Sequence, residues 1–185
     1  MGFDLYGEDP KFEDKKPAID WESKPSEKEA KKFFKQMQKF EDNNPGYYFR
    51  NNVWNWRPMW FFVCKELAPK VLSEEDLEKG MYNDGYVISA LKANHIADKI
   101  EAYDKKGALD EYVDEFEKAR DAVPKVLCEM CSGKGFRNDE HVKGKCNSCD
   151  GEGKDYPIQK QYPMSAENVR EFGKFCRNSG GFGVY

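Results

Sequence analysis

The chain has only two histidines, His95 and His141, and lacks the signatures of several common enzyme classes. It contains no Walker phosphate loop, no dinucleotide-binding glycine fingerprint, no HExxH metal motif and no serine nucleophile elbow. With so few imidazole groups, acid–base catalysis has few candidate residues. These absences favour a binding protein over an enzyme.

Long apolar runs are missing as well. The longest, residues 59–64, is far too short to span a bilayer, and residues 1–6 lack the basic and apolar regions of a signal peptide. We therefore expect no membrane association, no targeting segment and a cytoplasmic location. In a reducing cytoplasm, paired cysteines bind metal more often than they form disulfides.

The composition describes a soluble surface around a modest core. The 185 residues are 39% hydrophobic and 35% charged, so one domain with a small insertion is expected. The formal net charge of -4 disfavours nucleic acid as a partner, because clustered Lys and Arg supply the affinity for its phosphates. A local basic patch is still compatible with this composition.

Four cysteines form two matched pairs with the spacing C-x2-C-x14-C-x2-C. Each pair is followed by the same glycine rhythm, which lets the chain fold back so that backbone N–H groups can point at sulfur. The pattern predicts one structural Zn²⁺ bound by four thiolates, a closed site with no position for substrate. The predicted ligands are Cys128, Cys131, Cys146 and Cys149.

Capping residues and hydrophobic periodicity predict a mainly α fold of α+β character, with five or six helices and a minor strand pair from the two termini. We expect one mainly helical domain over residues 1–124 and 161–185, with a zinc knuckle inserted at 125–160. The predicted helix N-caps are Ser26, Ser73, Ser89 and Ser165.

The helix that follows Ser26 is expected to be amphipathic. Its apolar residues recur at helical spacing, and its opposite face is rich in lysine. The residues expected to be buried are Ala30, Phe33, Phe34, Met37 and Phe40.

An aromatic and polar segment follows this helix. Residues 47–56 are predicted to be extended, with a helix beginning at Pro58, because the residue before a proline disfavours helix. Alternation along a strand then places five side chains on one face: Tyr48, Arg50, Asn52, Trp54 and Trp56. Such a face could hold a nucleotide by stacking and hydrogen bonding. The alternative is that the aromatic residues are core and the polar residues cap helices.

Further polar residues could complete a ligand- or partner-binding site. The full candidate set also includes Asn51, Arg57, Asn83, Asp84 and His95. If the protein were an enzyme acting on a nucleotide or modified base, Asp84, His95 and Arg50 would be its polar groups. No catalytic residue is assigned.

The C-x2-C-x-G-x-G repeat resembles the cysteine-rich zinc domain of DnaJ-type co-chaperones, which carries four such repeats. Only two are present here, so the resemblance implies one zinc site, and the His-Pro-Asp signature of the J-domain is absent from the chain.

Several stretches together resemble an uncharacterised family of small proteins encoded by tailed bacteriophages and prophages. The matching stretches are residues 1–7, 46–58, 82–85, 165–172 and 180–182, with the paired cysteine knuckles. The resemblance implies a phage accessory protein in the host cytoplasm, where it would act by binding host machinery or a host immune signal.

The first functional hypothesis is therefore a non-enzymatic phage accessory protein of the counter-defence type. It would bind a host protein or sequester a nucleotide signal, with zinc in a structural role. The alternatives are a nucleic-acid-binding regulator that uses the knuckle loop and the tryptophan face, and the nucleotide-directed enzyme described above.

Overall fold

The computed structural model describes residues 2–12 and 14–185, and it has a mixed, mainly α fold, as predicted. Helices account for 48% of the chain and strands for 16%, so helices dominate. The described residues form six α-helices: α1 (Glu27–Asn43), α2 (Val53–Phe62), α3 (Glu74–Gly80), α4 (Ala90–Asp104), α5 (Ala108–Asp121) and α6 (Ala166–Asn178). The predicted N-caps Ser26, Ser73, Ser89 and Ser165 are confirmed, since each side chain accepts a backbone N–H of its helix.

The chain divides into two compact units. Unit 1 comprises Met1–Glu111 and Met164–Tyr185, and unit 2 comprises Tyr112–Pro163. Unit 2 holds the end of α5, the short strands β4 (Val126–Leu127), β5 (Phe136–Asn138), β6 (Lys143–Lys145) and β7 (Lys154–Asp155), and the 3-10 turns η2 (Glu129–Cys131) and η3 (Ile158–Gln161).

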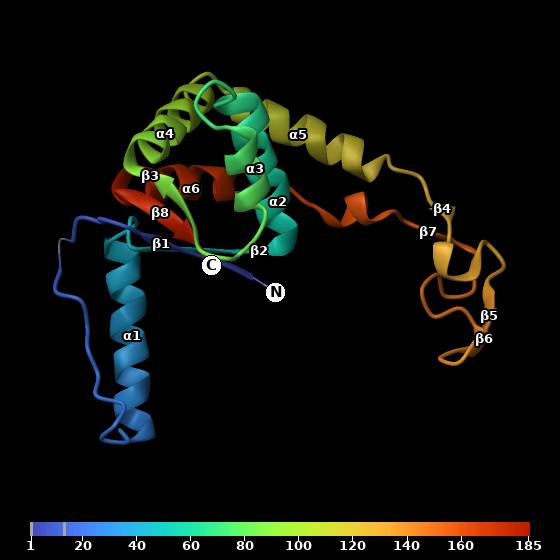
Figure 1. Cartoon of the computed structure of the whole chain (residues 1–185), viewed down its shortest axis with the longest axis horizontal. Helices are drawn as coiled ribbons and strands as arrows, with labels where there is room; N and C mark the ends of the chain where they lie inside the picture. Colours follow the sequence, from blue (N-terminus) through green and yellow to red (C-terminus); the bar gives the residue numbers. More distant parts are fainter. Residues whose placement is uncertain (1, 13) are drawn as a thin grey trace. The chain divides into compact units, whose positions relative to one another are not determined.

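Unit 1 is built on an antiparallel sheet with the strand order β2-β1-β8-β3 (Figure 1). Its strands are β1 (Gly2–Gly7), β2 (Tyr48–Asn52), β3 (Tyr86–Ser89) and β8 (Gly181–Val184). The predicted pairing of the two terminal strands is confirmed, with Leu5 opposite Val184. The strand β3 and the pairing of β2 with β1 at the edge of the sheet were not predicted.

Aromatic rings from α2, α6 and the sheet form the core of unit 1. The rings of Trp56 and Trp60 stack with centroids 5.3 Å apart, and Phe172 meets both edge-on. Phe182 of β8 packs against Phe172 at 5.7 Å. These four side chains are fully buried, so this cluster holds α2 and α6 against the sheet.

The prediction that residues 47–56 are extended is wrong after Asn52. The side-chain oxygen of Asn52 accepts the N–H groups of Trp54 and Asn55 at 3.0 Å, and this cap starts α2 at Val53. Pro58 lies inside α2 and does not begin it. Burial of Trp56 and Trp60 on one side of α2 outweighs the local preference against helix before proline. After α2 the chain continues as a π-helix, η1 (Val63–Leu67).

The predicted buried face of α1 is also largely wrong. Only Phe40 is buried, whereas Phe34 is 60% exposed. The residues before the helix cover part of its apolar side: Phe12 packs against Phe40 at 5.4 Å and Trp21 against Phe33 at 5.8 Å. Hydrophobic periodicity gave the helix correctly but overestimated how much core covers it.

A buried carboxylate joins α3 to α4. Asp76 is 0% exposed, and the Nζ of Lys92 donates to both of its oxygens at 2.7 Å. Ser73 donates through its backbone N–H and its hydroxyl, and Tyr86 donates its hydroxyl at 3.1 Å. Burial alone would raise the pKa of Asp76, but the hydrogen bonds from Lys92 and Ser73 outweigh it and lower the pKa.

We expect Asp76→Asn to lower the free energy of unfolding at pH 7 by about 3 kcal/mol, because it breaks a buried ion pair. Because the folded pKa is depressed, this contribution is complete above the ordinary value of 3.8 and is lost as the pH falls below it. Urea unfolding at several pH values measures the difference. The matched control is Glu75→Gln at the exposed neighbouring position, which should cost less than about 0.5 kcal/mol. Equal costs for the two variants would contradict this role.

Candidate functional site

The four paired cysteines converge in unit 2, as the spacing predicts. All four are buried, and their sulfur atoms lie within 4.8 Å of one another. The Sγ atoms of Cys128 and Cys146 are 4.0 Å apart, and those of Cys131 and Cys149 are 3.8 Å apart. These separations are far longer than the roughly 2.05 Å of a disulfide bond. The cluster is thus a set of four thiols that can hold a metal ion.

Two nearly identical loops build this cluster. In the first, the N–H of Gly133 donates to the carbonyl of Cys128 at 3.1 Å, and in the second Gly151 donates to Cys146 at the same distance. The loops also bond to each other reciprocally: Cys128 donates its backbone N–H to Gly153 and Cys146 donates to Gly135, both at 2.9 Å. The repeated sequence therefore forms a repeated structure in which each loop braces the other.

The glycine rhythm has a steric cause at two positions. Gly135 and Gly153 have positive φ angles of 71° and 72°. A Cβ atom at Gly135 would lie 2.3 Å from the carbonyl oxygen of Gly151, and one at Gly153 would lie 2.3 Å from that of Gly133. Any other residue at these two positions would push the loops apart through these close contacts. It would also be strained, because an L-residue adopts this backbone conformation with difficulty.

Backbone groups also orient the sulfur atoms. The N–H of Gly135 donates to the Sγ of Cys131 at 3.2 Å, and that of Gly153 donates to the Sγ of Cys149 at 3.3 Å. Burial alone raises the pKa of Cys128, but hydrogen bonds from the Cys131 backbone and the neighbouring thiols lower it to about 7. Burial and hydrogen bonds with the other three thiols raise the pKa of Cys149 to about 11. A bound cation would favour the thiolate form of all four.

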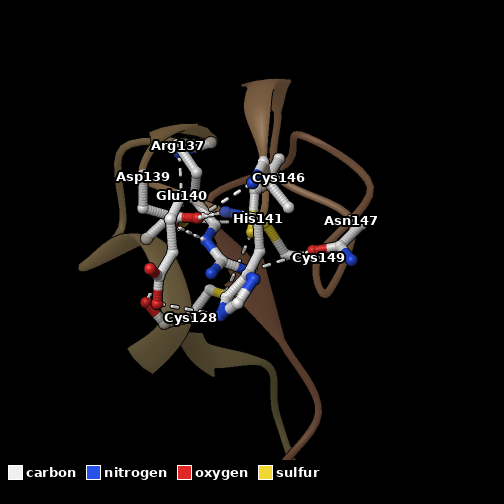
Figure 2. A network of polar contacts seen from close by, with 11 residues as sticks. Cys128, Arg137, Asp139, Glu140, His141, Cys146, Asn147 and Cys149 are labelled. Carbon is white, nitrogen blue, oxygen red and sulfur yellow. Dashed lines mark hydrogen bonds and ion pairs between the residues drawn. The ribbon is translucent and has the colours of Figure 1, made fainter.

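The hairpin of β5 and β6 lies beside the cysteines, and Figure 2 shows its polar side chains around them. Asp139 organises the turn by accepting the N–H groups of His141 and Val142 at 2.9 Å and the guanidinium of Arg137 at 2.7 Å. His141 is exposed, and its Nε2 is 3.2 Å from Glu140. It belongs to the turn and is not part of the cysteine cluster.

A polar hollow in unit 1 contains three of the predicted ligand-binding residues. It has a volume of about 510 Å³ and is lined by Gly2, Arg50, Asn51, Asn52, Asn55 and Asn168. The residues come from β1, the end of β2, the first turn of α2 and α6. Four asparagines and one arginine in one hollow form a dense array of amide donors and acceptors.

Hydrogen bonds hold part of this array in place. Asn51 is buried, and its Nδ2 donates to the Oδ1 of Asn168 at 3.2 Å while its own Oδ1 accepts the N–H of Asn52 at 3.1 Å. Arg50 is more exposed: its side chain is 69% exposed, and its Nε forms an ion pair with Asp4 at 3.6 Å. Gly2 lies beside the guanidinium, and a Cβ atom there would make only ordinary contacts, at 3.8 Å, with two of the Arg50 nitrogens.

The predicted aromatic face is only partly present. Tyr48, Arg50 and Asn52 do share one side of β2, but Trp54 and Trp56 belong to α2. Trp56 is fully buried, and its Nε1 donates to the carbonyl of Gly80 at 2.7 Å. It is a core residue and cannot stack on a ligand.

The remaining candidates lie outside the lining of the hollow. Tyr48 donates its hydroxyl to Asp4, and burial together with this hydrogen bond raises its pKa. Arg57 is half-buried, and Asn83, Asp84 and His95 are exposed. The Nδ1 of His95 is 3.1 Å from the carbonyl of Leu91 in its own helix. The polar set of the enzyme hypothesis, Asp84, His95 and Arg50, therefore does not meet in this hollow.

Three lining residues were not predicted: Gly2, Asn55 and Asn168. Asn55 belongs to the aromatic and polar segment, so its position beside the Asn52 cap could have indicated it. Asn168 is 117 positions from Asn51 in the sequence, and no local signal links the two.

No helix in the described part of the chain has both the length and the apolar composition needed to cross a membrane. Comparisons of the chain with models of protein families, with curated proteins and with solved structures give no match.

Proposed function

We propose that this protein is a non-enzymatic binding protein that sequesters a nucleotide in the polar hollow of unit 1 and uses a structural zinc ion to fold unit 2. The single observation that carries the nucleotide proposal is the lining of the hollow by Arg50 and four asparagines. The arrangement of the four cysteines supports the zinc proposal.

Zinc fits the cysteine cluster in both chemistry and dimensions. Four Zn–S bonds of about 2.3 Å in a regular tetrahedron place the sulfur atoms about 3.8 Å apart. The Sγ–Sγ distances of Cys131–Cys149 and Cys128–Cys146, 3.8 and 4.0 Å, match this value. Four thiolates without oxygen or imidazole ligands favour Zn²⁺ over harder cations such as Mg²⁺ and Ca²⁺. A bound zinc ion would cross-link the two loops, because each loop provides two of its four sulfur ligands. All four coordination positions of the ion would then be filled.

The lining of the hollow favours a nucleotide as ligand. An asparagine amide offers a donor and an acceptor in one plane, which matches the hydrogen-bonding edge of adenine and related bases. The exposed guanidinium of Arg50 can pair with a phosphate through two parallel hydrogen bonds. The N-terminal end of α2 lies at the same hollow and also favours a negatively charged group.

The same lining favours binding without turnover. Apart from Arg50, none of the lining side chains is titratable: they contain no carboxylate, imidazole, thiol or amine. General acid–base and nucleophilic catalysis both need such groups. The hollow offers hydrogen bonds and one fixed positive charge, which suit recognition.

The proposed biological setting rests on the resemblance to bacteriophage proteins. In the host cytoplasm, a small protein that binds a nucleotide tightly and does not convert it would lower the concentration of a signal used in host immunity. On this proposal the protein would be a counter-defence factor that acts on the host by sequestration.

We expect a nucleotide with a purine base to raise the melting temperature of unit 1 by about 10 °C at a concentration about 100 times its Kd. Arg50→Ala should weaken binding by about tenfold or more, because it removes a charge-assisted hydrogen bond. Thermal melts of the full chain with and without each member of a panel of mono-, di- and cyclic nucleotides measure the first effect, and calorimetric titration with the same panel measures the second. Chromatography of the recovered ligand tests for turnover.

The test variant is Asn55→Leu, and its matched control is Asn94→Leu. Both replace an amide on a helix of unit 1 by an aliphatic group, but only Asn55 lines the hollow. Binding that survives Asn55→Leu and Arg50→Ala, or a panel without any binder, would overturn the proposal. Conversion of the nucleotide would replace it with the enzyme alternative.

A second candidate function, the binding of a host protein, is favoured by a different observation. Unit 2 has a groove of about 470 Å³ whose lining includes exposed apolar side chains. The most exposed are Val126, Leu127, Met130, Tyr156 and Ile158. Leu127→Asp should abolish the binding of a partner at this groove, whereas Arg50→Ala should leave that binding unchanged. This difference separates the two functions.

A further inference from the structure

The helix α1 has a strongly basic side that belongs neither to the polar hollow nor to the cysteine cluster. Residues 11–39 contain nine lysines and six carboxylates, in a chain whose formal net charge is -4. At 3.6 residues per turn, the lysines of α1 fall within an arc of about 100°. They are Lys28, Lys31, Lys32, Lys35 and Lys39.

Most of these lysines are available to an external partner. All five are exposed, and Lys31 pairs with Glu27 at 2.6 Å. The other four have no ion-pair partner among residues 2–12 and 14–185. They extend over roughly 16 Å of helix, because each residue advances the axis by about 1.5 Å.

The segment before α1 extends this basic surface into a second cavity, separate from the polar hollow. A cavity of about 520 Å³ lies between residues 14–18 and α1, and Lys15, Lys16 and Lys39 line it. One carboxylate, Asp14, also lines it and accepts a hydrogen bond from Asn43 at 2.8 Å. The ammonium group of Lys16 also lies over the ring of Tyr47, 4.7 Å from its centroid. Three ammonium groups against one carboxylate leave this cavity positive, which favours a phosphate group.

Exposed aromatic rings border the lysine arc. The rings of Trp21 and Phe34 lie 5.9 Å apart and are 52% and 60% exposed. Phe34 follows Lys31 by three positions, so the two side chains are neighbours on the helix surface. Exposed rings beside a basic track are the combination on which unpaired bases stack.

We propose that α1 and the segment before it bind single-stranded nucleic acid, with the lysine arc on the phosphates and the Trp21–Phe34 pair on the bases. An anionic membrane fits less well, because the apolar side of α1 is not free to insert. Phe40 is buried, and Phe33 packs against Trp21 at 5.8 Å. Acidic protein segments would match the charge but would leave the aromatic pair unused.

Fluorescence anisotropy with a labelled 20-residue oligothymidylate tests the proposal on the full chain. We expect the logarithm of the affinity to fall linearly with the logarithm of salt concentration, with a slope that reports the phosphate contacts. The magnitude of this slope should fall by about three, at about 0.7 per lysine, in a quadruple variant of α1. Its substitutions are Lys28→Gln, Lys32→Gln, Lys35→Gln and Lys39→Gln. Phe34→Ala should lower the affinity about fivefold or more.

The matched control changes the same number of exposed lysines in unit 2: Lys134→Gln, Lys143→Gln, Lys145→Gln, Lys154→Gln. This control has the same net charge as the α1 variant, and it should keep the slope of the wild-type protein. Equal losses in both variants, or a loss only in the control, would overturn the proposal and place the contacts elsewhere. Anisotropy unchanged by wild-type protein at low salt, or binding of phosphatidylserine vesicles with no binding of the oligonucleotide, would overturn it as well.

This site is separable from the nucleotide hollow. Arg50→Ala should bind the oligonucleotide like the wild type, and a saturating mononucleotide should not displace it. Loss of oligonucleotide binding in Arg50→Ala would contradict the assignment to α1. Circular dichroism of the lysine variant checks that α1 is still helical, as expected since Gln is a good helix former.

Discussion

Replacing Cys128 and Cys146 together by serine is expected to unfold unit 2 and leave unit 1 folded. Among the residues described in unit 2, the buried apolar side chains are Val113 and the four cysteines. Its larger apolar residues, including Leu127 and Phe136, are exposed. A unit with so little core needs another source of stability, and a structural zinc ion contributes about 10 kcal/mol or more.

The positions of the tryptophans make this prediction simple to measure. All four tryptophans, residues 21, 54, 56 and 60, belong to unit 1, so their fluorescence reports on unit 1 alone. Amide hydrogen exchange should show that residues 125–160 lose protection in the double variant, while the tryptophan spectrum is unchanged. His141→Ala is the control and should keep one zinc ion per chain. Protection that survives in the double variant would contradict the structural role of the metal.

Trp56→Ala is expected to destabilise unit 1 by about 3–5 kcal/mol, the usual cost of removing a buried tryptophan. The ring stacks on Phe3 at 5.6 Å and on Trp60 at 5.3 Å, and its loss leaves the carbonyl of Gly80 without its donor. Such a loss is a large part of the 5–15 kcal/mol that stabilises a typical domain.

Trp54→Ala provides the contrast within the same helix. Trp54 is 38% exposed, and its replacement should cost about 1 kcal/mol, well below the cost at Trp56. Urea unfolding followed by far-ultraviolet circular dichroism compares the two variants without relying on tryptophan fluorescence. Equal destabilisation would contradict the division of these two residues between surface and core.

The cysteine cluster could be predicted from the sequence because its determinants are local. Two cysteines three positions apart with glycines behind them define a loop, and two such loops complete a site. The N–H groups expected at the sulfur atoms are those of Gly135 and Gly153. The four serine N-caps are local signals too, and all four start helices where expected.

The polar hollow could be predicted only in part, because its residues come together through the tertiary fold. Arg50, Asn51 and Asn52 were identified from an unusual density of polar groups beside a core helix. Asn168 joins them through the packing of α6 against β2, which no sequence pattern indicates. The error at Trp54 and Trp56 has the same origin, since a local rule about proline was outweighed by burial in the core.

Native mass spectrometry of the full chain with an equimolar mixture of nucleotides shows whether the hollow binds a nucleotide. We expect one zinc ion and one nucleotide per chain, with the nucleotide mass unchanged after prolonged incubation. In Asn55→Leu the zinc should remain and the nucleotide should be absent. A chain that carries zinc but never a nucleotide, or a nucleotide retained equally by Asn55→Leu, would contradict the assignment of the hollow as the ligand site.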